Sequence, residues 1–233
     1  NALDPGVKWP DWNGHISLSA SSKGRYKNNQ LVTSLNIRGL EGEFLNLPVA
    51  GAADIHVDGE SVTVKTLNLE SGADLVNLTG NLSEKWDLAL KVKIRDIGKF
   101  MPDSKGAVGL NARVTGVRKK PRIKMELTSS SFLYGDYSAD DIEADVDVDL
   151  ADRRKSYFDL NATNLNIKGE TVSSLELHAK GFLSSHPVSA VAAGDFGVAD
   201  FVAAGLYEDN TGSGGLTATR YQPETREKLS PGV

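Results

Sequence analysis

Five acidic side chains alternate with five apolar ones in one stretch, D-I-E-A-D-V-D-V-D-L at residues 141–150. Carboxylates at this density could bind Ca²⁺, which prefers oxygen ligands, or a basic partner. A single calcium site does not fit, because alternate strand residues lie about 6.6 to 7 Å apart and Ca²⁺ gathers ligands at about 2.3 to 2.6 Å. We expect a solvated face paired with basic residues of other strands, either Arg122 and Lys124 or Lys91 and Lys93.

Other chemistry is hard to find in the chain. The serine-hydrolase elbow G-x-S-x-G, the zinc motif H-E-x-x-H and the phosphate loop G-x-x-x-x-G-K-[ST] are all absent. There is no cysteine, and the four histidines are scattered. A net charge of −5 argues against a nucleic-acid binder. The sequence therefore predicts no enzyme, no cofactor, no metal site and no nucleic-acid partner. A polysaccharide lyase is a weak alternative, since it needs carboxylates and basic residues clustered in a cleft.

The elements that carry these residues are predicted to be strands. Strict alternation is typical of a strand with one wet face and one apolar face, and it recurs as W-D-L-A-L-K-V-K-I at residues 86–94. The two valines at positions 62 and 64 are out of phase with the leucines at 67 and 69, which predicts a bulge near Thr66. The same period elsewhere gives roughly fifteen strands and one helical turn, at residues 96–101.

Roughly fifteen strands in a meander would give a sheet some 65 to 70 Å long at ~4.8 Å per strand. A flat sheet of that length curls or splits, and no helices are predicted to cover its apolar face. The pattern leaves three architectures open: a sandwich, a solenoid or an elongated trough. Hydrophobic residues make up 39% of the chain and aromatic residues only 7%, which suits a shallow interior.

An internal repeat divides the predicted sheet. The stretch from Gly14 to Gly24 matches the stretch from Gly106 to Gly116, each running ten residues from glycine to glycine. We therefore expect a lead-in at residues 1–13, a first β repeat unit at 14–101, a second unit of the same continuous sheet at 102–222, and a polar tail at 223–233.

The apolar rows are the remaining candidate for function. If the sheet stays open, they form a dry groove suited to acyl chains, where each buried CH₂ contributes ~0.8 kcal/mol without polar contacts. The residues that best represent the predicted groove lining are Leu35, Ile37, Leu88, Leu90, Val92, Leu110, Met125, Leu127, Val146, Val148, Leu160 and Leu177.

Several segments together resemble the TamB family, the inner-membrane-anchored subunit of the translocation and assembly module of Gram-negative bacteria. They are G-H-I-S-L-S-A at residues 14–20, L-T-G-N-L at 78–82 before the strand at 86–94, and D-I-G-K-F-M-P-D-S-K-G at 96–106, which leads into G-L-N-A-R-V-T-G. The resemblance covers about residues 14–183 and includes no catalytic motif.

This resemblance implies a periplasmic, all-β, taco-like sheet with a hydrophobic groove and one short helical linker, similar to AsmA-like and bridge-like lipid-transfer proteins. The implied function is to hold or conduct phospholipid between the inner and outer membranes. The implied partners are phospholipid, an outer-membrane barrel of the TamA type, and the inner membrane through an anchor outside these residues. The alternative is a scaffold that assembles outer-membrane barrels or autotransporters by pairing its edge strands with client strands.

Overall fold

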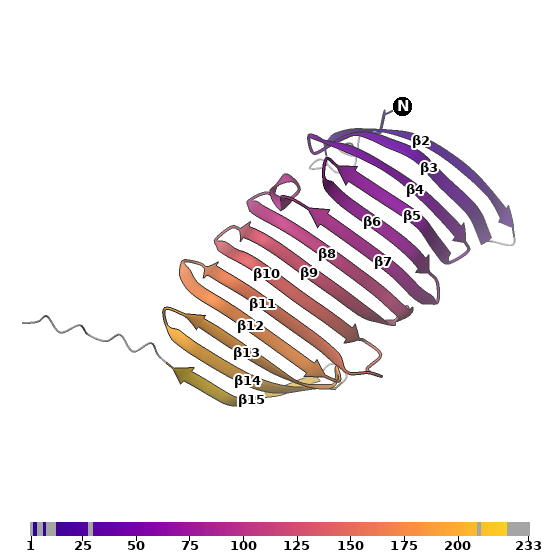
Figure 1. Cartoon of the computed structure of the whole chain (residues 1–233). Coiled ribbons are helices and arrows are strands. Elements are labelled where there is room, and N and C mark those ends of the chain that lie inside the picture. The colour runs from indigo at the N-terminus through magenta and orange to yellow at the C-terminus, as the bar shows by residue number, and fades with distance from the viewer. Residues whose placement is uncertain (1, 4–6, 8–12, 28–29, 209–210, 223–233) are drawn as a thin grey trace, which may run out of the picture.

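The computed structural model of the protein describes residues 2–3, 7, 13–27, 30–208 and 211–222. They form one antiparallel sheet of fifteen strands, in which each strand pairs with its neighbours in sequence (Figure 1). The strands are β1 (Ala2–Leu3), β2 (Gly14–Lys27), β3 (Gln30–Phe44), β4 (Leu47–Asp58), β5 (Ser61–Ser71), β6 (Asp74–Leu82), β7 (Lys85–Ile94), β8 (Ser104–Val117), β9 (Lys120–Tyr134), β10 (Tyr137–Asp149), β11 (Ser156–Ile167), β12 (Glu170–Gly181), β13 (Ser185–Gly194), β14 (Gly197–Glu208) and β15 (Thr211–Gln222).

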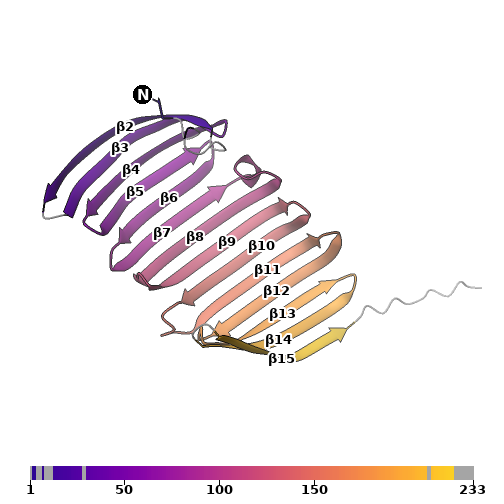
Figure 2. The ribbon, with the colours of Figure 1, turned by 180° about the vertical axis from the view of Figure 1, so that it is seen from behind.

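The sheet is long, curved and open, as the views from the two sides show (Figures 1 and 2). It does not close into a barrel, and β1 and β15 lie at its two ends. The prediction of an all-β, elongated groove is therefore confirmed, and the sandwich is wrong. No large side chain in the described part of the chain is fully buried, so no second layer covers the sheet there.

Turn chemistry and apolar periodicity explain why the chain folds back at these points. The hairpin between β4 and β5 turns at Gly59, whose φ of 57° is the left-handed conformation that glycine adopts without strain. The predicted bulge is confirmed, because the pairing of β5 with both neighbours shifts register around Lys65 and Thr66. This extra residue restores Leu67 and Leu69 to the face that carries Val64.

The predicted helical turn is a short 3₁₀ helix, η2 (Ile97–Lys99), between β7 and β8. The carboxylate of Asp96 caps it by accepting a hydrogen bond from the backbone N–H of Gly98. Asp74, only 3% exposed, accepts hydrogen bonds from the backbone N–H of Arg95 at 2.8 Å and from the Lys99 ammonium at 2.9 Å. This carboxylate therefore ties the linker to the beginning of β6.

The boundary predicted between the two repeat units falls at this linker. Strands β7 and β8 pair along their whole length across it, from Lys85 opposite Val117 to Ile94 opposite Val108, so the sheet is continuous there. That residues 14–101 and 102–222 are two copies of one unit stays a prediction. Most of the predicted lead-in and the whole predicted tail, residues 223–233, lie outside the described residues.

Candidate functional site

One face of the sheet carries an uninterrupted row of apolar side chains. Residues that lie directly opposite each other on neighbouring strands point to the same face, so the strand registers define the row without further assumptions. It takes one residue from each strand from β2 to β14: Ala20, Ile37, Ala53, Leu67, Leu78, Leu90, Ala112, Met125, Val146, Phe158, Ala179, Val188 and Ala203. At ~4.8 Å per strand this central row is about 58 Å long.

Two further rows flank the central row on the same face. The first also crosses from β2 to β14 and is broken only by one glycine: Leu18, Leu40, Gly51, Leu69, Val76, Val92, Leu110, Leu127, Ala144, Leu160, Leu177, Ala190 and Phe201. The second extends from β3 to β10: Leu35, Ile55, Val64, Gly80, Leu88, Val114, Ile123 and Val148. We call these three rows together the apolar face.

The structure places all twelve residues of the predicted groove lining on the apolar face, distributed over its three rows. That they contact a ligand stays a prediction. Sequence reasoning did not select Leu67, Leu78 or Phe158, which belong to the central row. For Leu67 the apolar alternation was present in the sequence but was shifted by the bulge. Leu78 lies in a segment without clear alternation, so only its pairing with Leu67 assigns it to this face.

The apolar face remains accessible. Its small side chains are nearly buried by their neighbours, with Ala53 and Val64 both 6% exposed, but larger ones protrude. Leu18, Leu69 and Phe201 are each about two-fifths exposed, at 41%, 39% and 40%. A face that buries its small residues between neighbours while its large ones stay in contact with solvent can bury an added apolar ligand.

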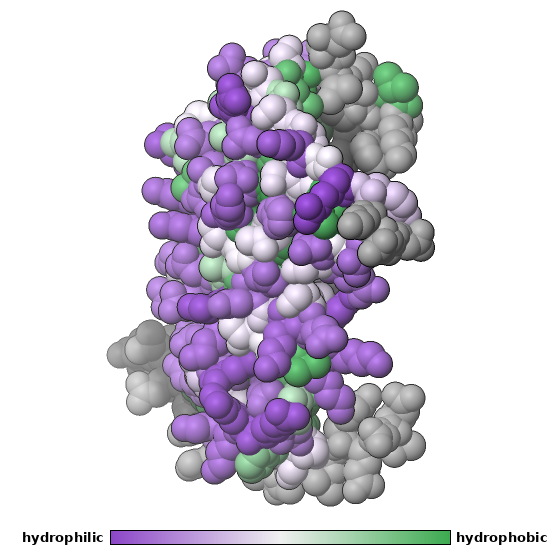
Figure 3. All heavy atoms as spheres, turned by 90° about the vertical axis from the view of Figure 1, so that its right-hand side faces the viewer, coloured by the Kyte–Doolittle hydropathy of each residue, from purple (hydrophilic) through white to green (hydrophobic). Residues whose placement is uncertain are grey.

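The opposite face carries the polar and charged side chains, and we call it the polar face. Seen from the side of the sheet, hydrophilic side chains dominate and hydrophobic ones show only in scattered places between them (Figure 3). A closely spaced ion pair of this face joins β9 and β10. Arg122 donates two hydrogen bonds to Asp147, at 2.6 and 2.5 Å, and the Lys124 ammonium lies 3.3 Å from the same carboxylate.

This pairing accounts for part of the acidic row, by which we mean the five alternating carboxylates from Asp141 to Asp149. Hydrogen bonds from Arg122 lower the pKa of Asp147 below its ordinary value, against burial, which raises it. Asp145 accepts a hydrogen bond from the Tyr157 hydroxyl, and Asp149 accepts them from two backbone N–H groups of the following turn. The predicted pairing is therefore confirmed at Asp147, whose basic partners are Arg122 and Lys124. The predicted solvated face is wrong for Asp147 and Asp149, which are only 4% and 8% exposed.

The alternative prediction, that Lys91 and Lys93 pair with the acidic row, is wrong. Lys91 lies on β7 opposite Asn77 and Asn111, and Lys93 lies opposite Leu75 and Gly109, three strands away from β10. The alternation of charge along each strand was readable from sequence. The sequence did not show which charged residues would lie opposite one another, because this depends on every hairpin between their strands.

A second group of charges on the polar face surrounds His178. Its Nδ1 lies 2.6 Å from an Asp159 carboxylate oxygen, and its Nε2 lies 3.8 Å from Glu176. The hydrogen bond to Asp159 raises the pKa of His178 above its ordinary value, and the negative charge of Glu176 adds to the effect. These groups are exposed, so they tune local charge and do not form a buried catalytic dyad.

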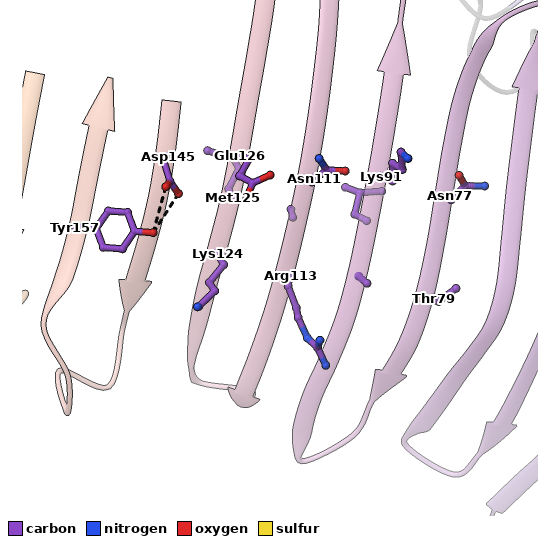
Figure 4. Close-up of a pocket in the computed structure, with 13 residues that line it drawn as sticks. Asn77, Thr79, Lys91, Asn111, Arg113, Lys124, Met125, Glu126, Asp145 and Tyr157 are labelled. Atoms are coloured by element: carbon purple, nitrogen blue, oxygen red, sulfur yellow. Dashed lines mark hydrogen bonds between the residues drawn. The ribbon is translucent and has the colours of Figure 1, made fainter. Parts of the chain in front are cut away.

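A shallow hollow of about 430 Å³ lies on the polar face over β6 to β11 (Figure 4). Its polar lining comes from different strands and includes Asn77, Lys91, Asn111, Glu126 and Asp145. Sequence reasoning missed this hollow, because these residues lie 14 to 20 positions apart in the chain and meet only through register.

The described residues lack both a metal-binding cluster of side chains and a membrane-spanning helix. They contain no group of three or more histidine, aspartate or glutamate side chains placed to hold a metal ion. They also contain no helix of the length and apolar character that crossing a membrane requires.

The fold and the apolar face together define an open, all-β groove protein. The family model described as "TamB, N-terminal domain" matches residues 1–223. The chain therefore belongs to the TamB family, as its sequence resemblance indicated. No curated protein and no solved structure matches the chain.

Proposed function

We propose that the apolar face holds the acyl chains of phospholipids and lets them move along the sheet axis between the inner and outer membranes. The observation that carries this proposal is the central row, which runs through thirteen neighbouring strands, β2 to β14, with an apolar side chain from each. Nothing within the described residues covers it.

Dimensions and energetics support this function. An acyl chain that spans half a bilayer core is ~15 Å long, about three strand spacings, so a face of about 58 Å accommodates several chains in series. Each buried CH₂ contributes ~0.8 kcal/mol, and this gain is non-directional. A chain can therefore shift by one strand without losing a specific contact, which is the property that a conduit needs.

Membership of the TamB family supports a proposal for where the chain acts and with which partner. We infer that the chain lies in the periplasm as part of an inner-membrane-anchored protein of a Gram-negative bacterium, that it acts without catalysis or a cofactor, and that it cooperates with an outer-membrane barrel of the TamA type. Head groups would stay in water at the open side of the groove, because the apolar rows offer them no hydrogen-bonding side chain.

Native mass spectrometry of the purified chain tests the proposal. The wild type is expected to carry phospholipid, identified by tandem spectrometry. The substitutions Leu90→Asp and Val146→Arg place a charge in the central row, and we expect each to remove at least nine-tenths of the bound lipid, since burying an unpaired charge beside an acyl chain is strongly unfavourable.

The matched control is Lys93→Asp, which changes charge on the polar face of the same strand as Leu90. It is expected to keep the lipid of the wild type, and circular dichroism should show that all three variants retain the sheet. A lipid-free wild type, or loss of lipid in the control as well, would contradict the proposal.

A second candidate function is a scaffold for outer-membrane barrel assembly, and one observation favours it. Among the described residues only Ala2 and Leu3 pair with the outer side of β2, so most of that strand presents an edge. A client strand could add to such an edge by backbone hydrogen bonding.

Proline substitutions in β2 test this scaffold function. Backbone N–H groups of successive residues point to opposite sides of a strand, so of two neighbouring residues one points its N–H to the free edge. One of the two single variants Ser22→Pro and Lys23→Pro therefore removes an N–H group that a client strand would need. If either proline abolishes barrel assembly while Leu90→Asp does not, the scaffold replaces the conduit.

A further inference from the structure

We propose that the hollow on the polar face is a binding site for a hydroxyl-rich oligosaccharide. This site does not use the apolar face, so it stands or falls independently of lipid binding. It is centred on Lys91, Asn111 and Glu126, which lie directly opposite one another on β7, β8 and β9.

These three side chains are available to a ligand. Each is exposed, and within the described part of the chain none of them has a hydrogen-bond or ion-pair partner from the protein. Their neighbours are engaged: Arg113 donates to Asp87 at 3.0 Å, and Lys124 pairs with Asp147. The hollow therefore offers a donor, an amide that both donates and accepts, and an acceptor, in a line about 10 Å long.

The arrangement of charge selects against strongly charged ligands. The lining carries charges of both signs, with ammonium or guanidinium groups at Lys91, Arg113 and Lys124 and carboxylates at Glu126 and Asp145. Among these five groups, only Arg113 and Lys124 have an ion-pair partner within the described residues. A polyanion bound at Lys91 would be repelled by the Glu126 carboxylate about 10 Å away. A polycation bound at Glu126 would likewise be repelled by the Lys91 ammonium. A neutral ligand satisfies both groups when it carries hydroxyls, since each hydroxyl donates and accepts.

The position of the hollow selects a sugar over a peptide. Extended peptides commonly bind by adding a strand to a free sheet edge, where backbone groups are unpaired. The hollow lies over β6 to β11, each of which has a paired neighbour on both sides, so the recognition here is by side chains. Tyr157, half-buried at the rim of the hollow, directs its hydroxyl to Asp145 at 3.2 Å and contributes an aromatic ring, against which the apolar side of a sugar ring can pack (Figure 4).

Titration of the isotopically labelled 233-residue chain with two probes, maltopentaose and tetra-N-acetylchitotetraose, tests this site by nuclear magnetic resonance. A shallow site with three free groups should bind with a Kd on the order of a millimolar. At least one probe is expected to shift the amide signals of β7, β8 and β9 in a saturable way. Asn111→Ala and Lys91→Ala should each weaken that binding roughly tenfold.

The matched control is Asn161→Ala, which removes an exposed amide from the polar face of β11 outside the hollow and should leave the affinity unchanged. Three results would overturn the proposal. These are no saturable shift with either probe up to about 20 mM, a shift that Asn111→Ala does not weaken, or equal binding of a neutral tetrapeptide of matched length.

Discussion

The two faces of the same strands organise their side chains in opposite ways. On β7 to β10 the central row reads Leu90, Ala112, Met125 and Val146, and it continues without a polar residue in both directions. One residue along each strand, the polar face reads Ala89, Arg113, Lys124 and Asp147, where the charges are engaged in local pairs. Apolar contact is non-directional and can be continuous, whereas charges are satisfied pair by pair. The same strand register therefore gives a continuous apolar row on one face. On the other face it gives separate ion pairs, each of which acts as a local clamp between strands.

The sharpest way to break this comparison is to remove the ion pair of Asp147. The substitution Asp147→Ala leaves Arg122, only a quarter exposed, without its partner and is expected to lower the free energy of unfolding by about 3 kcal/mol. Glu143→Ala, on the same strand and face but exposed, should change it by less than about 0.5 kcal/mol. Urea unfolding of both variants measures the difference. Equal effects would mean that the polar face has no local clamps.

A second clamp lies at the linker and makes stability depend on pH. Burial raises the pKa of Asp74, but hydrogen bonds from Arg95 and Lys99 outweigh it, so the pKa lies below its ordinary value. This stabilisation is complete above the ordinary pKa and is lost as the pH falls through the lowered one, below about pH 4. Asp74→Asn should cost about 2 kcal/mol at pH 7. The difference from the wild type should shrink in acid unfolding titrations, and a constant difference down to pH 2 would contradict the assignment.

The apolar face should tolerate truncation better than a closed core. Leu110→Ala is expected to cost about 1 kcal/mol, because Leu110 is half-buried and its removal leaves no enclosed cavity. The same change in a covered core costs about 2 to 5 kcal/mol. Thermal or urea unfolding measures the loss of stability and so distinguishes an uncovered face from a closed core. The control Lys93→Ala should leave the free energy of unfolding nearly unchanged. A loss above about 3 kcal/mol would indicate that another layer covers this face.

The smallest expected effect concerns the charge of the polar face near neutral pH. Asp159→Asn removes the main cause of the raised pKa of His178, so that pKa should fall toward about 6.5. In the wild type the interaction stabilises the fold below the ordinary pKa and is lost as the pH rises through the raised one. Titration of the His178 ring signals measures both values. An unchanged pKa in the variant would assign the shift to Glu176 instead.

The strands could be predicted because each is written locally, as in the alternation at residues 86–94 and 141–150. The bulge at Thr66 was also readable, because one extra residue shifts the period. The turn before β4 was not readable, since Leu45 and Asn46 make it with positive φ values of 52° and 60°, which residues other than glycine seldom adopt. The rows and the polar hollow depend on register, which sums over all turns, so Lys91 could not be placed beside Asn111 from sequence.

Site-specific photocrosslinking in living cells tests the central claim most directly. A photoreactive amino acid is placed at Leu110 or Leu177 on the apolar face, or at Lys93 or Asn161 on the polar face, and adducts are identified by mass spectrometry. We expect phospholipid adducts from Leu110 and Leu177 and none above background from the two polar positions. Adducts of equal yield from both faces, or protein strands instead of lipid on the apolar face, would contradict it.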